Sequence, residues 1–318
     1  MILPRGADVA RHSSRACSGD RLALLAWCRA TSIGQVAFEI LSAAKELTVT
    51  GVSSSGLFLM DPLGGVVFVS FEHSRGPVTI IAPSASSRMK GASAGTPVWV
   101  EHGWIAFPDQ AVAIPFSRDL IWKPMPPRGP ADSAAGRRRT LERAAARACA
   151  AKDGHGWSSL LATLVNGRGV ENLAGEERFT LERIGRFQTA MRQCDGVTAG
   201  ACLKELLGLG QGLTPSGDDM AAGLLLALNR WREVLRPVTG MEDVNQSVAE
   251  WARLHTTALS ATLIECAARG LASEHLIHAL DSIMTGTPSL DYSLPPLLQW
   301  GASSGIDSLL GMAVAIIG

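Results

Sequence analysis

Between Ile33 and about Trp122 the apolar residues occur in short runs rich in β-branched and aromatic side chains. Gly, Pro, Ser and Asp separate these runs at intervals typical of antiparallel sheets. The pairs Asp61-Pro62 and Gly64-Gly65 stand where hairpin turns are expected. The pattern predicts a β-rich domain over residues 31–125, with strands in VAFEIL, LTVTGVSSSGLFLM, GGVVFVSF, GPVTIIAP, TPVWVEHGWIAF and AVAIPF.

The pattern changes after KPMPPRGPADS, residues 123–133, which we interpret as a linker because proline continues neither a strand nor a helix. Helical periodicity then begins with RRRTLERAAARACAAK, for which Asp132 or Ser133 is the expected N-cap. Several later segments are apolar nearly all round, as are helices in the middle of a bundle. The chain is therefore expected to be α+β: a β-rich N-terminal domain followed by an α-helical domain over residues 126–318.

Residues 1–30 are expected to form a partly flexible N-terminal extension. Their run LALLAWC is at the short limit for a signal peptide, follows polar residues and lacks an A-x-A site. No apolar run reaches the roughly 20 residues that a membrane span needs. These features favour a cytoplasmic protein with no membrane association.

The charge balance is neutral, with 29 basic and 29 acidic residues among 318. It gives no electrostatic reason to expect nucleic acid as a partner. The six cysteines are scattered without a C-x-x-C pair, so neither a disulfide framework nor a zinc cluster is expected. At 47% hydrophobic residues the chain can bury a large core.

Two phrases in the helical part repeat each other. The stretch GLGQGLTPSGDDMAAGLLLAL, residues 208–228, contains S-G-D-D from Ser216, and the C-terminal segment contains S-G-I-D from Ser304. Both fit S-G-x-D-x-x-x-G-x-x-x-A, ending at Ala227 and Ala315, and both place a glycine turn before an apolar helix.

The repeat predicts a geometry for the two helices. Gly223 and Gly311 lie one turn inward from Asp219 and Asp307, and glycine lets two backbones approach closely. We therefore expect the helices to cross there, so that the two carboxylates face a shared cleft.

The first of these helix starts favours an anion. Pro215 suits the first turn of a helix because no backbone donor is lost there, and Ser216 or a neighbour can cap the helix. Unpaired N–H groups and the helix dipole then attract negative charge.

A purely structural interpretation competes with a ligand site. A carboxylate in the first turn ordinarily stabilises a helix by about 0.3–1 kcal/mol, which accounts for one Asp in each phrase. It does not account for Thr214, Ser216, Asp218 and Asp219 together beside apolar helices, because burying unpaired polar groups costs a few kcal/mol. We favour a ligand site.

A third segment, HTTALS, adds hydroxyl groups on a helix. Thr256 and Ser260 are one turn apart and point the same way, although mid-helix hydroxyls also commonly bond to helix carbonyls. Ser303 and Ser304 add further hydroxyls near Asp307.

Several familiar motifs are absent from the chain: a P-loop, H-E-x-x-H and a G-x-S-x-G elbow. GLGQG follows a helical pattern, unlike the glycine fingerprint of a dinucleotide-binding fold. Two carboxylates with hydroxyls can hold Mg²⁺, but no spacing demands it, so we assign no cofactor and no metal-ligating residue.

Three phrases together resemble a known family: GLGQGLTPSGDDMAAGLLLAL, HTTALSATLIECAARG and GASSGIDSLLG. The family includes the AllH subunit of the oxamate carbamoyltransferase of anaerobic allantoin breakdown, and the likeness extends from about Ile33 to the C-terminus. It implies a transferase or transferase subunit in purine and allantoin nitrogen metabolism. Such an enzyme exchanges a carbamoyl group between phosphate and an amide such as oxamate, acting with partner subunits or as a homo-oligomer.

The resemblance also implies the site residues. The candidate catalytic residues are Asp218, Asp219, Thr214 and Ser216. The candidate substrate-binding residues are Gly210, Gly212, Gly217, Thr256, Thr257, Ser260, Ser304, Gly305 and Asp307. We expect Thr214, Ser216 and the Gly217 backbone to hold a phosphate or carboxylate anion or an oxyanion, and Asp219 with Asp218 to orient the attacking nitrogen or hold Mg²⁺.

Three other functions remain open at this point. A hydrolase or lyase acting on a small amide or ureido substrate would use the same residues with water as acceptor. A non-catalytic binding subunit would need a partner to act. A structural role would make the two phrases helix-packing devices only.

Overall fold

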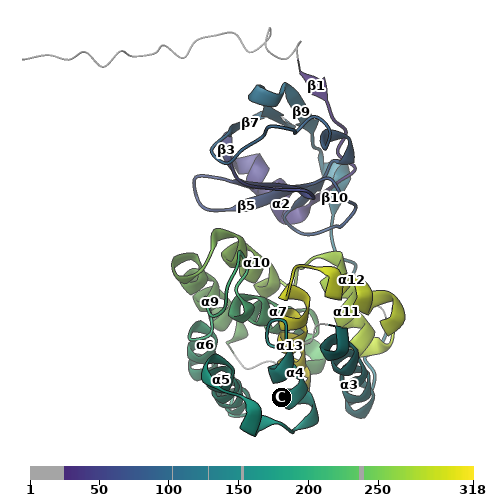
Figure 1. The fold of residues 1–318 in the computed structure, drawn as a ribbon, viewed down its shortest axis with the longest axis vertical. Helices are drawn as coiled ribbons and strands as arrows, with labels where there is room; N and C mark the ends of the chain where they lie inside the picture. The colour runs from purple at the N-terminus through teal and green to yellow at the C-terminus, as the bar shows by residue number, and fades with distance from the viewer. Residues whose placement is uncertain (1–24, 102, 128, 152–153, 236–239) are drawn as a thin grey trace, which may run out of the picture.

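The computed structural model describes residues 25–101, 103–127, 129–151, 154–235 and 240–318. A curled β-sheet comes first and a bundle of helices follows it, which confirms the predicted α+β fold class (Figure 1). Residues 1–24 of the expected N-terminal extension lie outside the described residues. In the part of the chain that is described, no helix combines the length and the apolar character needed to cross a membrane.

The described strands form one ten-stranded sheet in the order β1-β9-β8-β7-β3-β4-β5-β6-β2-β10. The pairs β1–β9, β5–β6 and β2–β10 are parallel and the other pairs are antiparallel. The strands are β1 (Ala26–Trp27), β2 (Ser32–Gly34), β3 (Glu46–Ser53), β4 (Gly56–Met60), β5 (Val66–Ser70), β6 (Thr79–Ile81), β7 (Pro97–Glu101), β8 (Trp104–Phe107), β9 (Val112–Pro115) and β10 (Ile121–Trp122).

Alternation of apolar and polar residues builds the core of the sheet. In β3, Leu47 and Val49 are buried while Thr48 between them is exposed, as expected for a strand with one covered face. The turn predicted at Gly64-Gly65 is confirmed, because Asp61 N donates to the carbonyl of Gly65 and Gly64 has φ +88°. Three short 3₁₀ turns connect strands: η1 (Pro83–Ala85), η2 (Pro108–Gln110) and η3 (Arg118–Leu120).

One predicted strand is wrong. VAFEIL lies inside helix α2 (Gln35–Ala43), whose buried residues Val36, Ala37 and Leu41 pack against the sheet and the helical part. The spacing of these residues suits a helix face, whereas a short apolar run by itself does not distinguish a helix from a buried strand.

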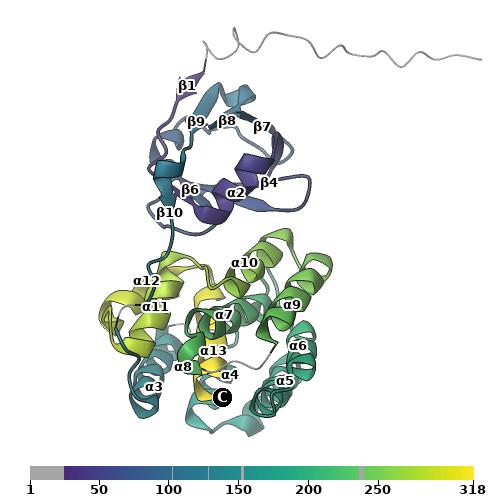
Figure 2. The ribbon, with the colours of Figure 1, turned by 180° about the vertical axis from the view of Figure 1, so that it is seen from behind.

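The remaining helices form the bundle. They are α3 (Ala134–Ala151), α4 (Ser158–Asn166), α5 (Gly175–Arg192), α6 (Gly196–Lys204), α7 (Ser216–Arg230), α8 (Arg232–Leu235), α9 (Met241–His255), α10 (Ala258–Ala268), α11 (Glu274–Thr285), α12 (Leu290–Gln299) and α13 (Ser304–Ile317), with a 3₁₀ turn η4 (Val170–Asn172). In both views α7 and α13 lie in the middle, with α3, α11 and α12 on one side and α5, α6 and α9 on the other (Figure 1, Figure 2). The two helices that carry the repeated phrase are therefore the centre of the bundle, as their apolar character predicts.

The linker is held to the bundle at the start of α3. The hydroxyl of Ser133 accepts from the N–H of Gly136 at 3.1 Å, which confirms the predicted helix cap. Just before it, Asp132 N donates to the carbonyl of Met284 in α11 at 2.7 Å.

The sheet and the bundle also contact each other directly. Val36 and Val78 from the β-rich part form a buried cluster with Cys266 of α10. Arg269, just after α10, donates two hydrogen bonds of 2.9 Å to the carboxylate of Glu39 in α2. This contact lies at α10, the helix that also borders the candidate site described next.

Candidate functional site

The crossing of α7 and α13 depends on the two glycines that the repeat singled out. A Cβ atom on Gly223 would lie 2.0 Å from the carbonyl oxygen of Ser308, and one on Gly311 would lie 1.9 Å from that of Met220. Neither position has room for a side chain, since real Cβ contacts do not fall below 3.0 Å. The predicted close crossing is therefore present, and it brings the two helix starts together.

At the crossing each helix offers a hydroxyl to the carboxylate of the other. Ser304 of α13 acts on Asp219 of α7, and Ser216 of α7 acts on Asp307 of α13; in both cases the hydroxyl favours the charged form. Thr214, just before α7, shares a hydrogen bond of 3.0 Å with Ser304. The repeated phrase thus places its serine and its aspartate in an exchange between two helices.

Asp219 is a buried carboxyl group with a strongly raised pKa. Its side chain is 2% exposed, and its Oδ2 atom is buried without a hydrogen-bond partner. Burial raises the pKa of Asp219 to about 8, the hydroxyls of Ser304 and Thr214 oppose this rise, and the charges of Asp307 and Asp218 add to it. Asp219 therefore keeps its proton near neutral pH.

Asp307 is fully buried and has a backbone donor, whereas none of the described residues gives Asp219 one. The N–H of Trp157 donates to its Oδ1 atom at 2.8 Å, while its Oδ2 atom has no partner. Burial raises the pKa of Asp307, whereas the Trp157 N–H and the hydroxyls of Ser216 and Ser303 lower it.

The loop before α4 supplies this donor and was not predicted to belong to the site. Gly156 has φ +51°, and a Cβ there would lie 2.5 Å from Oδ1 of Asp307, so only glycine lets this backbone approach the carboxylate. The signal available in the sequence was the glycine pair in GHGW. The two partners are 150 residues apart, and the donor is a backbone N–H, which every residue except proline has, so the sequence does not predict this contact.

Asp218 serves a different contact from its neighbour. Its two oxygens accept from the N–H of Gly208 at 2.8 Å and from the hydroxyl of Thr256. Burial raises the pKa of Asp218, and these donors together with the hydroxyl of Ser260 lower it. Asp218 therefore ties the glycine-rich loop to the end of α9 and the start of α10.

Thr257 completes that tie. Its hydroxyl accepts from the N–H of Ser260 at 3.1 Å, which caps α10, and donates to the carbonyl of Leu213 at 2.7 Å. Thr256 and Thr257 thus hold the loop before α7 in place from the side, and the N–H of Ser260 helps to fix Thr257.

The glycines of the motif have packing roles. A Cβ on Gly217 would lie 1.9 Å from the carbonyl of Leu206, and the N–H of Gly217 donates to Leu209, so that donor is already used inside the protein. Gly305 stands in the same way against the carbonyl of Leu297, at 2.0 Å. Gly210 has φ +101°, and a side chain there would meet the N–H of Ser216 at 2.7 Å.

Ser216 does not cap α7 as predicted. Pro215 occupies the N-cap position, no side chain caps the helix, and Ser216 is the first helical residue. Because of this position its hydroxyl faces Asp307 across the crossing rather than the N–H groups of its own helix.

The electrostatics of the site are those of carboxyl and hydroxyl groups. Among the described residues, the groups that act on Asp218, Asp219 and Asp307 include no Lys, Arg or His side chain. In the described part of the chain, the groups that offset their charge are hydroxyls and backbone N–H groups. As far as the described groups go, the crossing suits a neutral group that can both donate and accept hydrogen bonds better than it suits an anion.

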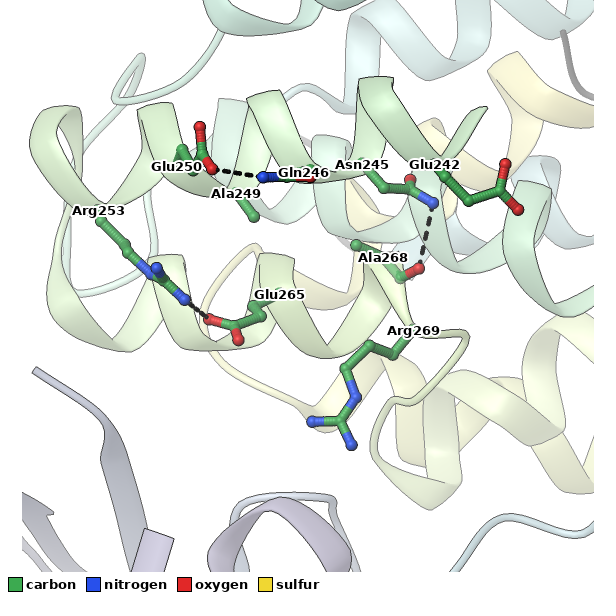
Figure 3. A pocket seen from close by; sticks show the side chains of 9 residues that line it. All are labelled: Glu242, Asn245, Gln246, Ala249, Glu250, Arg253, Glu265, Ala268 and Arg269. Carbon is green, nitrogen blue, oxygen red and sulfur yellow. Dashed lines mark hydrogen bonds and ion pairs between the residues drawn. The ribbon is translucent and has the colours of Figure 1, made fainter. Parts of the chain in front are cut away.

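A separate hollow of about 430 Å³ lies along α9 and α10 (Figure 3). Most of its polar side chains pair with each other or with the backbone: Gln246 with Glu250, Arg253 with Glu265, and Asn245 with the carbonyl of Ala268. None of the predicted site residues lines it.

The described part of the chain contains neither a cluster of metal-binding side chains nor a disulfide. No group of three or more His, Cys, Asp or Glu side chains there is arranged to hold a metal ion. The expectation that Asp219 with Asp218 can hold Mg²⁺ therefore rests on the sequence alone. The five cysteines that are described form no disulfide with one another.

Comparison with known proteins finds a match to the segment that contains both repeated phrases. No solved structure matches the chain. A family model matches residues 206–316, which span the glycine-rich loop and the helices from α7 to α13 as far as Ile316. The family is described as "Oxamate carbamoyltransferase subunit AllH", and the match confirms the resemblance to it over this segment.

Proposed function

We propose that this chain is a carbamoyltransferase-type enzyme, or a subunit of one, that binds a small amide or ureido carboxylate at the crossing of α7 and α13. Phosphate or carbamoyl phosphate is the second reactant. The family match over residues 206–316 supports this class of reaction.

One observation carries the proposal. Asp219 and Asp307 are 2% and 0% exposed, and each keeps a buried Oδ2 atom that has no hydrogen-bond partner among the described residues. Leaving such a group unpaired costs roughly 1–3 kcal/mol. A carboxylate in the first turn stabilises a helix by only about 0.3–1 kcal/mol, so a purely structural role does not offset this cost. A ligand that pairs with both oxygens recovers this free energy on binding.

The reaction that fits is the phosphorolysis of an oxalurate-like ureide. The C–N bond between the carbamoyl carbon and the oxamate nitrogen breaks, and a C–O bond from hydrogen phosphate to that carbon forms. The proton that the oxamate nitrogen gains equals the one that hydrogen phosphate loses. Asp219, which holds a proton near neutral pH, can give it to the leaving nitrogen and take it back from the phosphate side.

The other motif residues have supporting roles in this scheme. Thr214, Ser216 and Ser304 donate or accept hydrogen bonds around the two carboxyl groups. Asp218, with Thr256, positions the glycine-rich loop, and we place it outside the reacting groups. Gly210 and Gly212 in that loop are exposed, and Gly210 lies against Ser216 at the start of α7.

A non-catalytic binding subunit is the second candidate, and the charges favour it. Because the described groups acting on the three carboxylates include no cation, the phosphate of the reaction needs positive charge from elsewhere. A partner subunit that brings this charge would make the chain inactive when alone.

The test is calorimetric titration of the purified full-length chain at pH 7 with oxamate, oxalurate and carbamoyl phosphate. We expect at least one to bind to the wild type and at least tenfold more weakly to Asp219→Ala. Asp243→Ala, which removes an exposed acid from the first turn of α9, is the matched control and should bind as the wild type does. Melting temperatures verify that each variant is folded.

Turnover separates the candidates. Formation of carbamoyl phosphate from oxalurate and phosphate supports the enzyme, and oxalurate breakdown without phosphate supports a hydrolase or lyase. Binding with no turnover supports the non-catalytic subunit. If none of the three ligands binds, or Asp219→Ala binds them unchanged, the crossing is not the site.

A further inference from the structure

The two helix starts differ in one respect that bears on what they bind. Asp307 has a backbone donor, the N–H of Trp157, whereas hydroxyl groups are the donors acting on Asp219. Two carboxyl groups that act on each other inside a protein cannot both ionise cheaply, so such a pair retains one proton. The donor difference decides that the proton belongs to Asp219 and the charge to Asp307.

We infer that Asp219 and Asp307 recognise an unsubstituted amide group, H₂N–C(=O)–, as a donor–acceptor pair. In the bound state the protonated carboxyl of Asp219 donates a hydrogen bond to the carbonyl oxygen, and the carboxylate of Asp307 accepts one from the amide N–H. This inference rests on the proposed function and adds which end of the substrate enters the crossing. The anionic end of oxamate or oxalurate points away from it, toward the exposed glycine loop.

The chemistry of the pair selects this group. A primary amide presents an acceptor and a donor side by side, which is the complement of one protonated and one ionised carboxyl. A carboxylate in its place would bring a third charge between Asp307 and Asp218, and a methyl group would leave the buried oxygen of Asp307 unpaired. The two unpartnered Oδ2 atoms are both more than nine-tenths buried, and they are the atoms with which such a ligand would form hydrogen bonds.

Three small molecules of nearly the same shape test the inference. Oxamate, pyruvate and oxalate share an α-oxo carboxylate and differ in one substituent, which is NH₂, CH₃ or O⁻. Titrated into the full-length chain at pH 7, oxamate should bind at least tenfold more tightly than either of the others. Equal binding of all three would overturn the amide assignment while leaving the site, and with it the proposed function, in place.

Substitution of Asp219 sharpens the result. Asn is a neutral residue that still donates a hydrogen bond, so Asp219→Asn should bind oxamate within about threefold of the wild type, whereas Asp219→Ala should lose at least tenfold. Wild-type binding should also weaken above pH 8, as Asp219 ionises beside Asp307 and Asp218, the two charged groups acting on it, and Asp219→Asn should not weaken. Binding that requires Mg²⁺ and disappears in Asp219→Asn would overturn the inference, because a cation needs both groups ionised.

A measurement without ligand keeps the inference testable when the chain is alone. Infrared spectra of protein with ¹³C-labelled aspartate should show the carbonyl stretch of a protonated carboxyl at pH 7 in the wild type and in Asp243→Asn. The band should be absent in Asp219→Asn. Its absence from the folded wild type would contradict a proton-sharing pair, whereas failure of oxamate, oxalurate and carbamoyl phosphate all to bind contradicts the proposed function itself.

Discussion

The starts of α7 and α13 are two copies of one phrase with different neighbours. Each begins with Ser-Gly, places an aspartate three residues after the serine and reaches its crossing glycine four residues later. In α7 the position before the aspartate is Asp218, which ties the glycine-rich loop to α10; in α13 it is the buried apolar Ile306. The second copy instead receives the backbone N–H of Trp157.

This difference teaches how a repeat acquires two chemical roles. Both carboxyl groups are buried, and burial raises the pKa of each. A single backbone donor favours the charged form of Asp307, while burial, the charge of Asp307 and, least, the charge of Asp218 favour the neutral form of Asp219. The phrase sets the geometry and part of the electrostatics, and the N–H of Trp157, which lies outside the phrase, adds the difference between the two carboxyl groups.

Breaking the crossing should have the largest effect. In Gly311→Val the new Cβ would lie 1.9 Å from the carbonyl of Met220 and 2.6 Å from the N–H of Leu224, both rigid helix backbone. Overpacking of a core typically costs about 1–3 kcal/mol, and we expect at least the upper end because neither atom can rotate away. Urea denaturation should show a loss of about 3 kcal/mol or more, or no folded protein.

A matched glycine elsewhere provides the control. Gly185 lies inside α5, and a Cβ added there would have nothing within 4 Å, so Gly185→Ala should stabilise the protein by about 0.5–1 kcal/mol. If Gly311→Val folded with wild-type stability, the close approach of the two copies would not be needed for the fold.

Raising the pH until Asp219, the aspartate of the first copy, ionises should have the next largest effect on stability. The pKa of Asp219 is about 8 in the folded protein and 3.8 in an unperturbed aspartate, so between these values the folded state holds a proton that the unfolded state lacks. The stability from this proton is complete below pH 3.8 and is lost as the pH rises through about 8. From pH 6.5 to 8.5 the wild type should lose about 2 kcal/mol relative to Asp219→Asn.

The window of pH 6.5 to 8.5 keeps another titrating group out of the comparison. Burial lowers the pKa of His275 from 6.5 to about 4, so most of its effect on stability lies between these pH values, and the remainder is the same in the wild type and Asp219→Asn. Urea midpoints of the wild type, Asp219→Asn and the surface control Asp243→Asn measure the difference. Parallel profiles for the wild type and Asp219→Asn would place the shared proton elsewhere.

The sequence was informative where the signal is local and periodic. Gly223 and Gly311 stand at equal distances from equal phrases, so their crossing could be predicted from spacing alone. The contact from Trp157 could not, because a backbone N–H has no residue-specific signature and its partner lies 150 residues away. The expectation of an anion relied on unpaired N–H groups at α7, and tertiary packing of Gly217 against Leu209 uses one of them.

The fold shows the same limit. The predicted strand VAFEIL is part of α2, since a short apolar run fits a buried strand and a buried helix equally well. The change from strands to helices after the proline-rich linker was predictable for a different reason. Several short apolar runs before the linker all favour strands, and several longer segments after it all have helical periodicity.

Removing the contact that only the first copy has should cost an intermediate amount. In Thr256→Val a methyl group replaces the hydroxyl that donates to Asp218, while the shape of the side chain is kept. Losing one hydrogen bond to a buried charged group costs about 1–3 kcal/mol. The same change should raise the pKa of Asp218 and leave oxamate binding within about threefold, because Asp218 positions the loop. A tenfold loss of binding with unchanged stability would instead place Asp218 among the groups that touch the ligand.

The smallest effect is expected at Ser308, which occupies in α13 the place that Met220 occupies in α7. Its hydroxyl is buried without a partner, and its carbonyl is the group that Gly223 contacts. Ser308→Ala removes an unsatisfied polar atom and almost no volume, so stability should stay within about 0.5 kcal/mol of the wild type or rise slightly. Urea denaturation measures this, with Ser304→Ala as the comparison, because that serine hydroxyl bonds to Thr214 and acts on Asp219. If Ser308→Ala cost as much as Ser304→Ala, the two copies would share more polar contacts than the serine–aspartate exchange, and Ser308 would belong to the site.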